Sequence, residues 1–166
     1  MLFRSMQGYW QQPEATAEAL RGGWFHTGDM ATWREDGYLL IVDRKKDIIV
    51  SGGENISSLE VEKALVAHPG VYEVAVIPVP DPKWGEIPKA LIVLKPGAQA
   101  TTEELIEFCR SRISHYKAPR SVEFVQSLPK TGTGKILKKD LRKQHAQSAK
   151  QAGLELAAHK GKDSRR

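Results

Sequence analysis

The chain has 166 residues, of which 40% are hydrophobic and 27% charged, a length and composition typical of one folded, water-soluble domain with an extension. No apolar run approaches the roughly 20 residues of a bilayer-spanning helix, and the first residues lack the apolar core of a secretory signal, which argues against a membrane span. The formal net charge is +5, but residues 138–166 carry nine Lys or Arg against three Asp or Glu, so the remainder is close to neutral.

The basic segment at 138–166 has no aromatic residues between its charges, which is untypical of nucleic-acid-binding surfaces. We therefore expect no nucleic-acid partner. Residues 146–166 are expected to form a basic tail that is helical or disordered.

Cysteine and histidine usage gives no sign of a metal or redox site. The single cysteine, Cys109, excludes an internal disulfide and a multi-cysteine metal site. It follows the helical spacing Ile106, Cys109, Ile113, which favours a buried thiol over a nucleophile. The five histidines are scattered without a pair at helical ligand spacing. We therefore expect no metal site within this chain and a cytoplasmic location.

The first predicted elements are a short helix and a hairpin. Pro at the start of residues 13–20 and the glycine pair at 22–23 predict a helix over 13–20. Two strand-like runs, 30–33 and 38–42, are joined by a segment ending in Asp-Gly at 36–37, which is a hairpin signal.

The charged run at 43–47 lies between two apolar stretches and is the best candidate for a domain boundary. Residues 48–50 are strand-like, and Ser-Gly-Gly at 51–53 interrupts them. Two capping-box patterns, in which Glu follows Ser or Thr by three positions, predict helices that begin at 57–60 and 101–104.

Short apolar runs supply the remaining strands. Residues 74–79 and 90–94 are rich in Val, Ile and Leu, as in strands covered by helices, and residues 122–124 alternate apolar with polar. A loop at 129–135 leads to a basic helix from about residue 136. The order β-α-β-β-α-β-α predicts an α+β domain, a small mixed sheet with packed helices.

The loop Thr-Gly-Thr-Gly-Lys at 131–135 invites comparison with a phosphate-binding loop. A Walker loop needs Gly six residues before its Lys and Ser or Thr after it, but these positions hold Pro129 and Ile136. The segment is therefore not a Walker loop but a Gly-rich loop that carries one ammonium group, that of Lys135. That ammonium is either a solvated loop cation or a point charge that reaches an anion.

Read together and in order, several blocks resemble the adenylate-forming enzymes, a family of acyl-CoA synthetases, luciferases and the adenylation domains of peptide synthetases. The resemblance covers about residues 6–143. Its blocks are Trp-Phe-His-Thr-Gly-Asp at 24–29, Asp-Arg-Lys-Lys-Asp at 43–47, Ser-Gly-Gly-Glu-Asn-Ile at 51–56 and Pro-Lys-Thr-Gly-Thr-Gly-Lys-Ile at 129–136, with further similarity at 8–16 and 82–86. The resemblance implies the C-terminal domain of an acyl-CoA synthetase, preceded by a β-hairpin and a linker from the end of a larger domain.

This resemblance implies two half-reactions. A carboxylic acid, expected to be a fatty acid, attacks ATP to give an acyl-adenylate and pyrophosphate, and coenzyme A then displaces AMP. Lys135 matches the family's adenylation lysine and is the expected catalytic residue, because a fixed cation stabilises the charge that develops in the first step. Mg²⁺ is expected to be bound by the large domain, together with the acyl pocket.

Other residues match the family's binding and hinge positions. Asp29 and Arg44 are expected to bind the ribose hydroxyls of the nucleotide. Lys46 matches the hinge about which the small domain rotates between the two steps. After that rotation, Gly52 and Gly53 are expected to face the active site, where missing side chains admit the narrow pantetheine arm of coenzyme A.

The implied domains are a C-terminal remnant of the large AMP-binding domain at 1–43, a hinge at 44–46, a small α+β domain at 47–145 and the basic tail at 146–166. We expect the chain to be part of a longer acid–thiol ligase, with the large domain as its covalent partner, and to be inactive alone. The alternative is a free-standing small domain that acts as an interaction module in trans with a separate large domain.

Overall fold

The computed structural model describes residues 6–146, and these residues form two compact units that divide between Lys46 and Asp47. The division falls directly after the residue that the sequence suggests as a hinge. The part of the predicted basic tail beyond residue 146 lies outside the described residues.

The first unit contains a short helix and a two-stranded antiparallel sheet. Its elements are α1 (Pro13–Ala19), the 3₁₀ turn η1 (Arg21–Gly23), β1 (Asp29–Trp33) and β2 (Leu39–Arg44). The hairpin turn is the predicted Asp-Gly turn, in which Gly37 has a φ of 81° and the Asp36 carboxylate accepts the Tyr38 N–H at 3.2 Å. Large apolar side chains of the hairpin are 38–74% exposed, namely Met30, Trp33, Leu39, Leu40 and Ile41.

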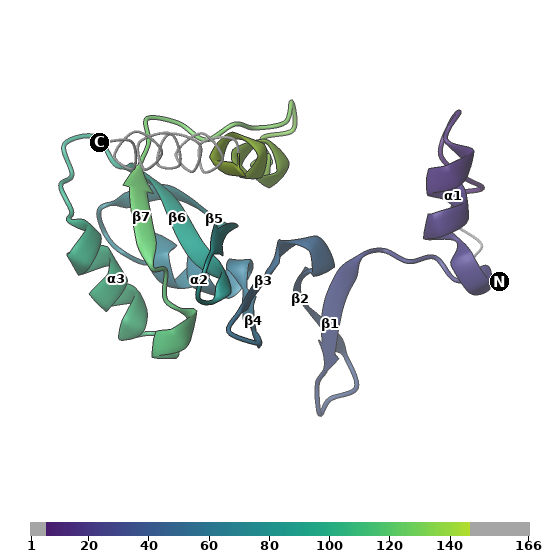
Figure 1. Ribbon diagram of the computed structural model, residues 1–166, viewed down its shortest axis with the longest axis horizontal. Helices are drawn as coiled ribbons and strands as arrows, with labels where there is room; N and C mark the ends of the chain where they lie inside the picture. The colour runs from purple at the N-terminus through teal and green to yellow at the C-terminus, as the bar shows by residue number, and fades with distance from the viewer. Residues whose placement is uncertain (1–5, 147–166) are drawn as a thin grey trace, which may run out of the picture. The chain divides into compact units, whose positions relative to one another are not determined.

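The second unit is a five-stranded sheet with helices packed on it (Figure 1). Its elements are η2 (Lys45–Asp47, which begins in the first unit), β3 (Ile48–Ser51), β4 (Glu54–Ser57), α2 (Ser58–Val66), β5 (Val71–Asp81), β6 (Gly85–Leu94), α3 (Thr102–Arg110), η3 (His115–Lys117), β7 (Ser121–Phe124) and a helix at 138–146.

Strand β6 organises the sheet. One of its edges pairs antiparallel with β5 along the whole strand, from Val71 opposite Leu94 to Asp81 opposite Gly85. It also pairs in parallel with β7 and, at Gly85 alone, antiparallel with β3, which forms a tight hairpin with β4. The sheet is therefore mixed.

Alternation along β5 and β6 gives the sheet two apolar faces. One face packs against α2 and α3 in a buried cluster that includes Ile49, Ile56, Val61, Leu65, Val74, Val76, Ile92, Leu105 and Cys109. The other face holds a smaller buried cluster of Ala75, Ile77, Leu91, Leu128 and Leu141. Because Leu141 belongs to the helix at 138–146, that helix lies on the face opposite α2 and α3 (Figure 1).

The predicted α+β class is confirmed, and so are the capping boundaries of α2 and α3. Ser57 caps α2 by accepting the Glu60 N–H at 3.3 Å, and Thr101 and Glu104 form a complete capping box on α3. The predicted element order omitted β4, because the Ser-Gly-Gly segment read as the end of a strand rather than as a two-residue hairpin turn. The last helix begins at 138 rather than about 136.

Candidate functional site

Asp29 and Arg44, the expected ribose-binding pair, lie together in the first unit. They are cross-strand partners at the open end of the β1–β2 hairpin, where Asp29 begins one strand and Arg44 ends the other. Arg44 Nε lies 3.5 Å from Asp29 Oδ1, and both side chains are partly exposed. The Thr27 hydroxyl accepts the Asp29 N–H at 3.1 Å, which fixes the backbone that presents the carboxylate.

A shallow hollow beside this pair is lined by Thr27, Gly28, Arg44, Lys45 and Lys46. The Lys45 N–H donates to the Gly28 carbonyl at 2.8 Å, which ties the chain leaving β2 to the chain entering β1. Three of the five lining residues, Arg44, Lys45 and Lys46, are basic, although the atoms that face the hollow are mainly apolar.

Gly52 and Gly53 form the two-residue turn of the β3–β4 hairpin, here called the glycine turn. Their φ values are 60° and 89°, as a turn with two left-handed residues requires. The two glycines have different surroundings. A Cβ on Gly52 would lie 2.7 Å from the Trp84 ring, whereas a Cβ on Gly53 would meet no heavy atom within 4 Å.

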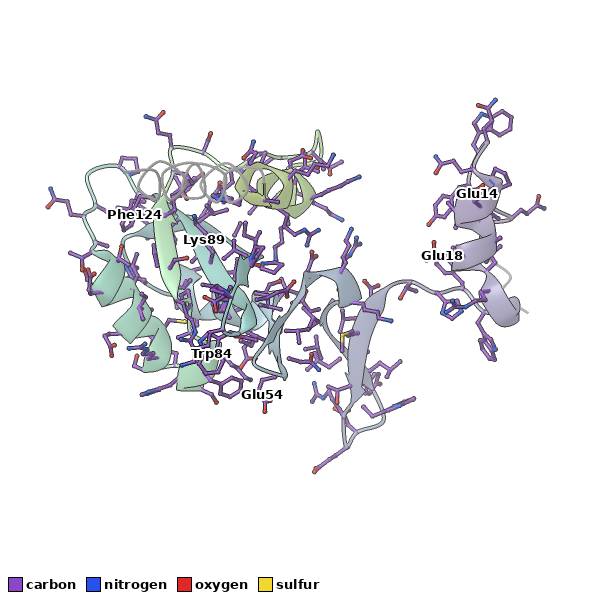
Figure 2. The ribbon with its side chains drawn as sticks, in the orientation of Figure 1. Glu14, Glu18, Glu54, Trp84, Lys89 and Phe124 are labelled. Carbon is purple, nitrogen blue, oxygen red and sulfur yellow. The ribbon has the colours of Figure 1, made fainter. Side chains whose placement is uncertain are left out.

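Trp84 lies beside the glycine turn, in the loop that joins β5 to β6 (Figure 2). Its carbonyl accepts the Gly52 N–H at 2.9 Å, and its own N–H donates to Asp81 Oδ1 at 2.8 Å. Two cations flank the ring, with the Arg120 guanidinium carbon 4.6 Å and Lys83 Nζ 4.9 Å from its centroid. The result is a cationic and aromatic group next to the glycine turn.

Sequence reasoning missed this group. No local pattern in the sequence joins Trp84 to Arg120, because the two residues are 36 positions apart along the chain. The sequence signal that points to Trp84 is the similarity of the block at 82–86 to the family, but that similarity assigns no role to the tryptophan.

Lys135 ends the loop at 131–135, here called the lysine loop. Local hydrogen bonds close this loop, with the Thr131 N–H donating to the Lys135 carbonyl at 2.8 Å and the Lys135 N–H donating to Thr131 Oγ1 at 3.1 Å. An isolated antiparallel bridge between Lys130 and Ile136 forms its base. Lys135 is exposed, so its ammonium can reach a ligand outside this chain.

The glycine turn and the lysine loop lie toward opposite ends of the β5–β6 hairpin. The glycine turn contacts Trp84 at the closed end of that hairpin. The base of the lysine loop lies toward the other end, because Lys130 forms an ion pair with Glu73 near the start of β5. At about 3.3 Å per residue, the strand from Glu73 to Asp81 spans about 26 Å, so the glycine turn and the base of the lysine loop are well separated on this unit.

Titratable groups elsewhere in the second unit serve its structure. Burial, with a smaller effect of Glu60, raises the pKa of the Cys109 thiol to about 11, so the predicted buried thiol is confirmed and is unreactive. A hydrogen bond to Glu60 at 2.8 Å raises the pKa of Lys117. Within residues 6–146, no cluster of His, Cys, Asp or Glu could hold a metal ion, and no helix is long and apolar enough to cross a bilayer.

Comparison with known proteins is consistent across sequence and structure. The profile of the AMP-binding enzyme C-terminal domain matches residues 60–135. A feruloyl-CoA synthase from Amycolatopsis sp is 56% identical over 138 residues, covering 83% of this chain and 28% of that protein. A long-chain-fatty-acid–CoA ligase from Bacillus subtilis (strain 168) is 51% identical, covering 86% of this chain and 26% of that protein.

Among solved structures, the anthranilate CoA ligase AuaEII in complex with anthranoyl-AMP is 37% identical with a TM-score of 0.79, covering 87% of this chain and 28% of that one. The chain thus spans little more than a quarter of the length of the curated relatives described above.

Proposed function

We propose that this chain, which belongs to the AMP-binding enzyme C-terminal domain family, is the mobile C-terminal part of an acid–CoA ligase. Joined to a large AMP-binding domain, it would activate a carboxylic acid with ATP and pass the acyl group to coenzyme A. The observation that carries the proposal is the placement of the lysine loop and the glycine turn toward opposite ends of one hairpin, because two loops so separated would each face one bound substrate in a different orientation of this unit.

In the first half-reaction, a carboxylate oxygen of the acid attacks the α-phosphorus of ATP and the bond to pyrophosphate breaks. Negative charge develops on the phosphate oxygens, and the Lys135 ammonium would stabilise it. The exposure of Lys135 at the end of a short, hydrogen-bonded loop supports this role. Asp29 would accept hydrogen bonds from the ribose hydroxyls, with Arg44 beside it donating to the same sugar.

In the second half-reaction, the coenzyme A thiolate attacks the acyl carbonyl carbon and AMP leaves. The glycine turn would face the entering thiol, and Gly53 is the residue whose missing side chain leaves space. Arg120 and Lys83, which flank Trp84, would bind the phosphates of coenzyme A. Lys46, the last residue of the first unit, would be the hinge between the two orientations.

The acid is proposed only as a carboxylic acid, with a fatty acid as one candidate. The similar proteins carry the names of feruloyl, long-chain fatty acyl and anthranilate ligases, so similarity in this part of the chain does not select among acids. ATP and coenzyme A are the proposed cosubstrates, with Mg²⁺ bound by the large domain. A cytoplasmic location is consistent with the single, unpaired Cys109.

A fusion protein tests the proposal. The large domain of the Amycolatopsis feruloyl-CoA synthase would be joined to this chain in place of its own C-terminal part. We expect the fusion to form feruloyl-CoA from ferulate, ATP and coenzyme A, while this chain alone releases no pyrophosphate. The same large domain mixed with this chain as a separate polypeptide tests the alternative of action in trans. A fusion no more active than the large domain alone would contradict the proposal.

A further inference from the structure

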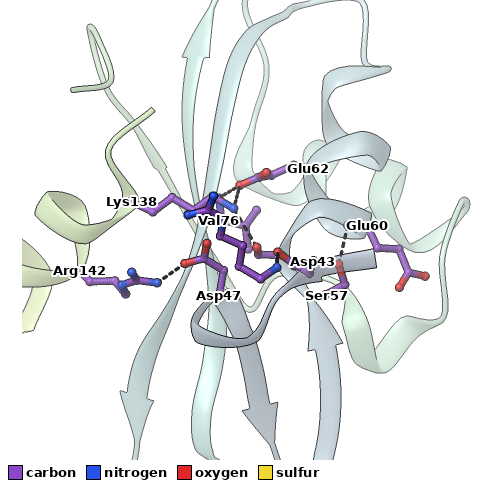
Figure 3. Close-up of polar contacts among 10 residues, drawn as sticks. Asp43, Asp47, Ser57, Glu60, Glu62, Val76, Lys138 and Arg142 are labelled. Carbon is purple, nitrogen blue, oxygen red and sulfur yellow. Dashed lines mark hydrogen bonds and ion pairs between the residues drawn. The ribbon is translucent and has the colours of Figure 1, made fainter. Parts of the chain in front are cut away.

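The helix at 138–146 begins three residues after Lys135 and is tied to α2 by a partly buried polar cluster. Lys138 Nζ lies 2.7 Å from the Glu62 carboxylate and 2.8 Å from Ser58 Oγ (Figure 3). The Lys138 and Glu62 side chains are each only 14% exposed. Glu62 is itself fixed, because it accepts the Val76 N–H of β5 at 2.7 Å.

One helical turn later, Arg142 forms an ion pair and a hydrogen bond with Asp47 (Figure 3). Asp47 is the first residue of the second unit, directly after the proposed hinge. The four-residue spacing places Lys138 and Arg142 on one face of the helix. Through this face, the helix that follows the lysine loop is tied to α2 and to Asp47, here called the hinge exit.

The glycine turn does not depend on this helix. Its flanking strands, β3 and β4, pair with each other over four residues, and the Gly52 N–H is bonded to Trp84. By contrast, the bridge between Lys130 and Ile136 only closes the lysine loop on itself, and the loop is joined to regular structure by the Lys130–Glu73 ion pair to β5 and by the helix that follows it.

We propose that Arg142 and Lys138 are positioning residues for the adenylation step. By holding the helix at 138–146 to Asp47 and to α2, they make the lysine loop move as one body with the hinge exit when the second unit rotates. The catalytic part of this inference rests on the proposed function, whereas the holding of the loop does not.

The expected effect on the reaction follows from geometry. A displacement of about 1 Å in a catalytic group can cost about a hundredfold in rate. Because the packing of Leu141 still holds the helix, loss of the Arg142 pair alone should displace the loop only in part. We therefore expect Arg142→Gln to slow adenylation about tenfold, and thioester formation from a preformed adenylate less than twofold.

The first test needs no reaction and uses this chain as it is. In Arg142→Gln, amide hydrogen exchange of Thr131, Gly134 and Leu137 should rise at least tenfold, while that of Gly52 stays unchanged. Lys139→Gln is the matched control, because it removes the same charge from an exposed neighbour on the same helix and should alter neither. Unchanged exchange in the lysine loop of Arg142→Gln would overturn the inference.

The second test measures both half-reactions in the fusion protein. Arg142→Lys, which keeps the charge, should restore most of the adenylation rate. Equal slowing of both half-reactions by Arg142→Gln would mean that the pair only stabilises the fold, and would overturn the positioning role. An unsubstituted fusion that makes no adenylate would instead refute the proposed function, and the exchange experiment would still decide whether Arg142 holds the loop.

Discussion

Gly52 and Gly53 share one turn, but their side-chain positions face a ring and open space respectively. Alanine at either position would have to adopt a left-handed conformation, which costs about 1 kcal/mol. At Gly52 the new Cβ would also displace Trp84. We therefore expect Gly52→Ala to lower the free energy of unfolding more than Gly53→Ala does, as measured by urea denaturation of this chain. Equal losses of unfolding free energy in the two variants would show that the Trp84 ring moves aside without an energetic cost.

His145 gives the second unit a pH dependence whose sign follows from the surroundings of its ring. Burial, together with the positive charge of Lys89, whose Nζ lies 3.4 Å from its ring, lowers the pKa of His145 in the folded state, against a smaller opposing effect of Glu123. The unfolded chain therefore binds a proton more readily, and the stability contributed by the neutral imidazole is lost as pH falls below the ordinary value of 6.5.

We predict a difference between two proteins in how steeply the free energy of unfolding changes with pH. Between about pH 7.5 and about pH 5.5, the free energy of unfolding should fall less in His145→Gln than in the unsubstituted chain. Glu123 does not confound this window, because a hydrogen bond from Lys89 lowers its pKa from 4.5 and keeps it ionised. Identical slopes in denaturant titrations would contradict the account.

At the scale of elements, the capping box of α3 is the local feature with the most direct test. The Thr101 hydroxyl accepts the Glu104 N–H at 3.1 Å, and the Glu104 carboxylate accepts the Thr101 N–H at 3.4 Å. Thr101→Ala should lower the free energy of unfolding by about 1 kcal/mol. Thr102→Ala, one position inside the helix, is the control and should have a much smaller effect in the same thermal or urea melts.

Elements set by neighbouring residues could be predicted from the sequence. The Asp-Gly turn specified the first hairpin, and the spacing of Thr101 and Glu104 specified the start of α3. Both signals act within four residues, so local backbone chemistry is sufficient. The Lys135 loop was likewise visible because glycine and threonine leave few alternatives to a turn.

Features that depend on pairing between distant residues could not be predicted in this way. Strands β5 and β6 extend beyond the expected apolar runs, through Pro80 in β5 and Pro88 in β6, although proline usually argues against an internal strand. These proline positions belong to regular strands because β5 and β6 pair with each other along their whole length. The Asp47–Arg142 ion pair joins residues that are 95 positions apart, and no local sequence pattern predicts it.

At the scale of the whole molecule, the central claim is that one small unit presents different loops in two successive reactions. The closed end of the β5–β6 hairpin contacts the glycine turn, and the lysine loop has its base toward the other end. The claim is therefore tested by measuring how a substitution in each loop affects each of the two half-reactions, rather than by measuring the overall rate alone.

The most direct measurement compares the two half-reactions in the fusion protein for Lys135→Ala and Gly52→Leu. Lys135→Ala should slow pyrophosphate release from acid and ATP by a hundredfold to a thousandfold, on the order expected for a lost charge contact, and leave thioester formation from a preformed acyl-adenylate nearly intact. Gly52→Leu, which displaces the Trp84 ring and with it the cations proposed to bind coenzyme A, should slow only thioester formation. Equal impairment of both steps by Lys135→Ala would contradict the account.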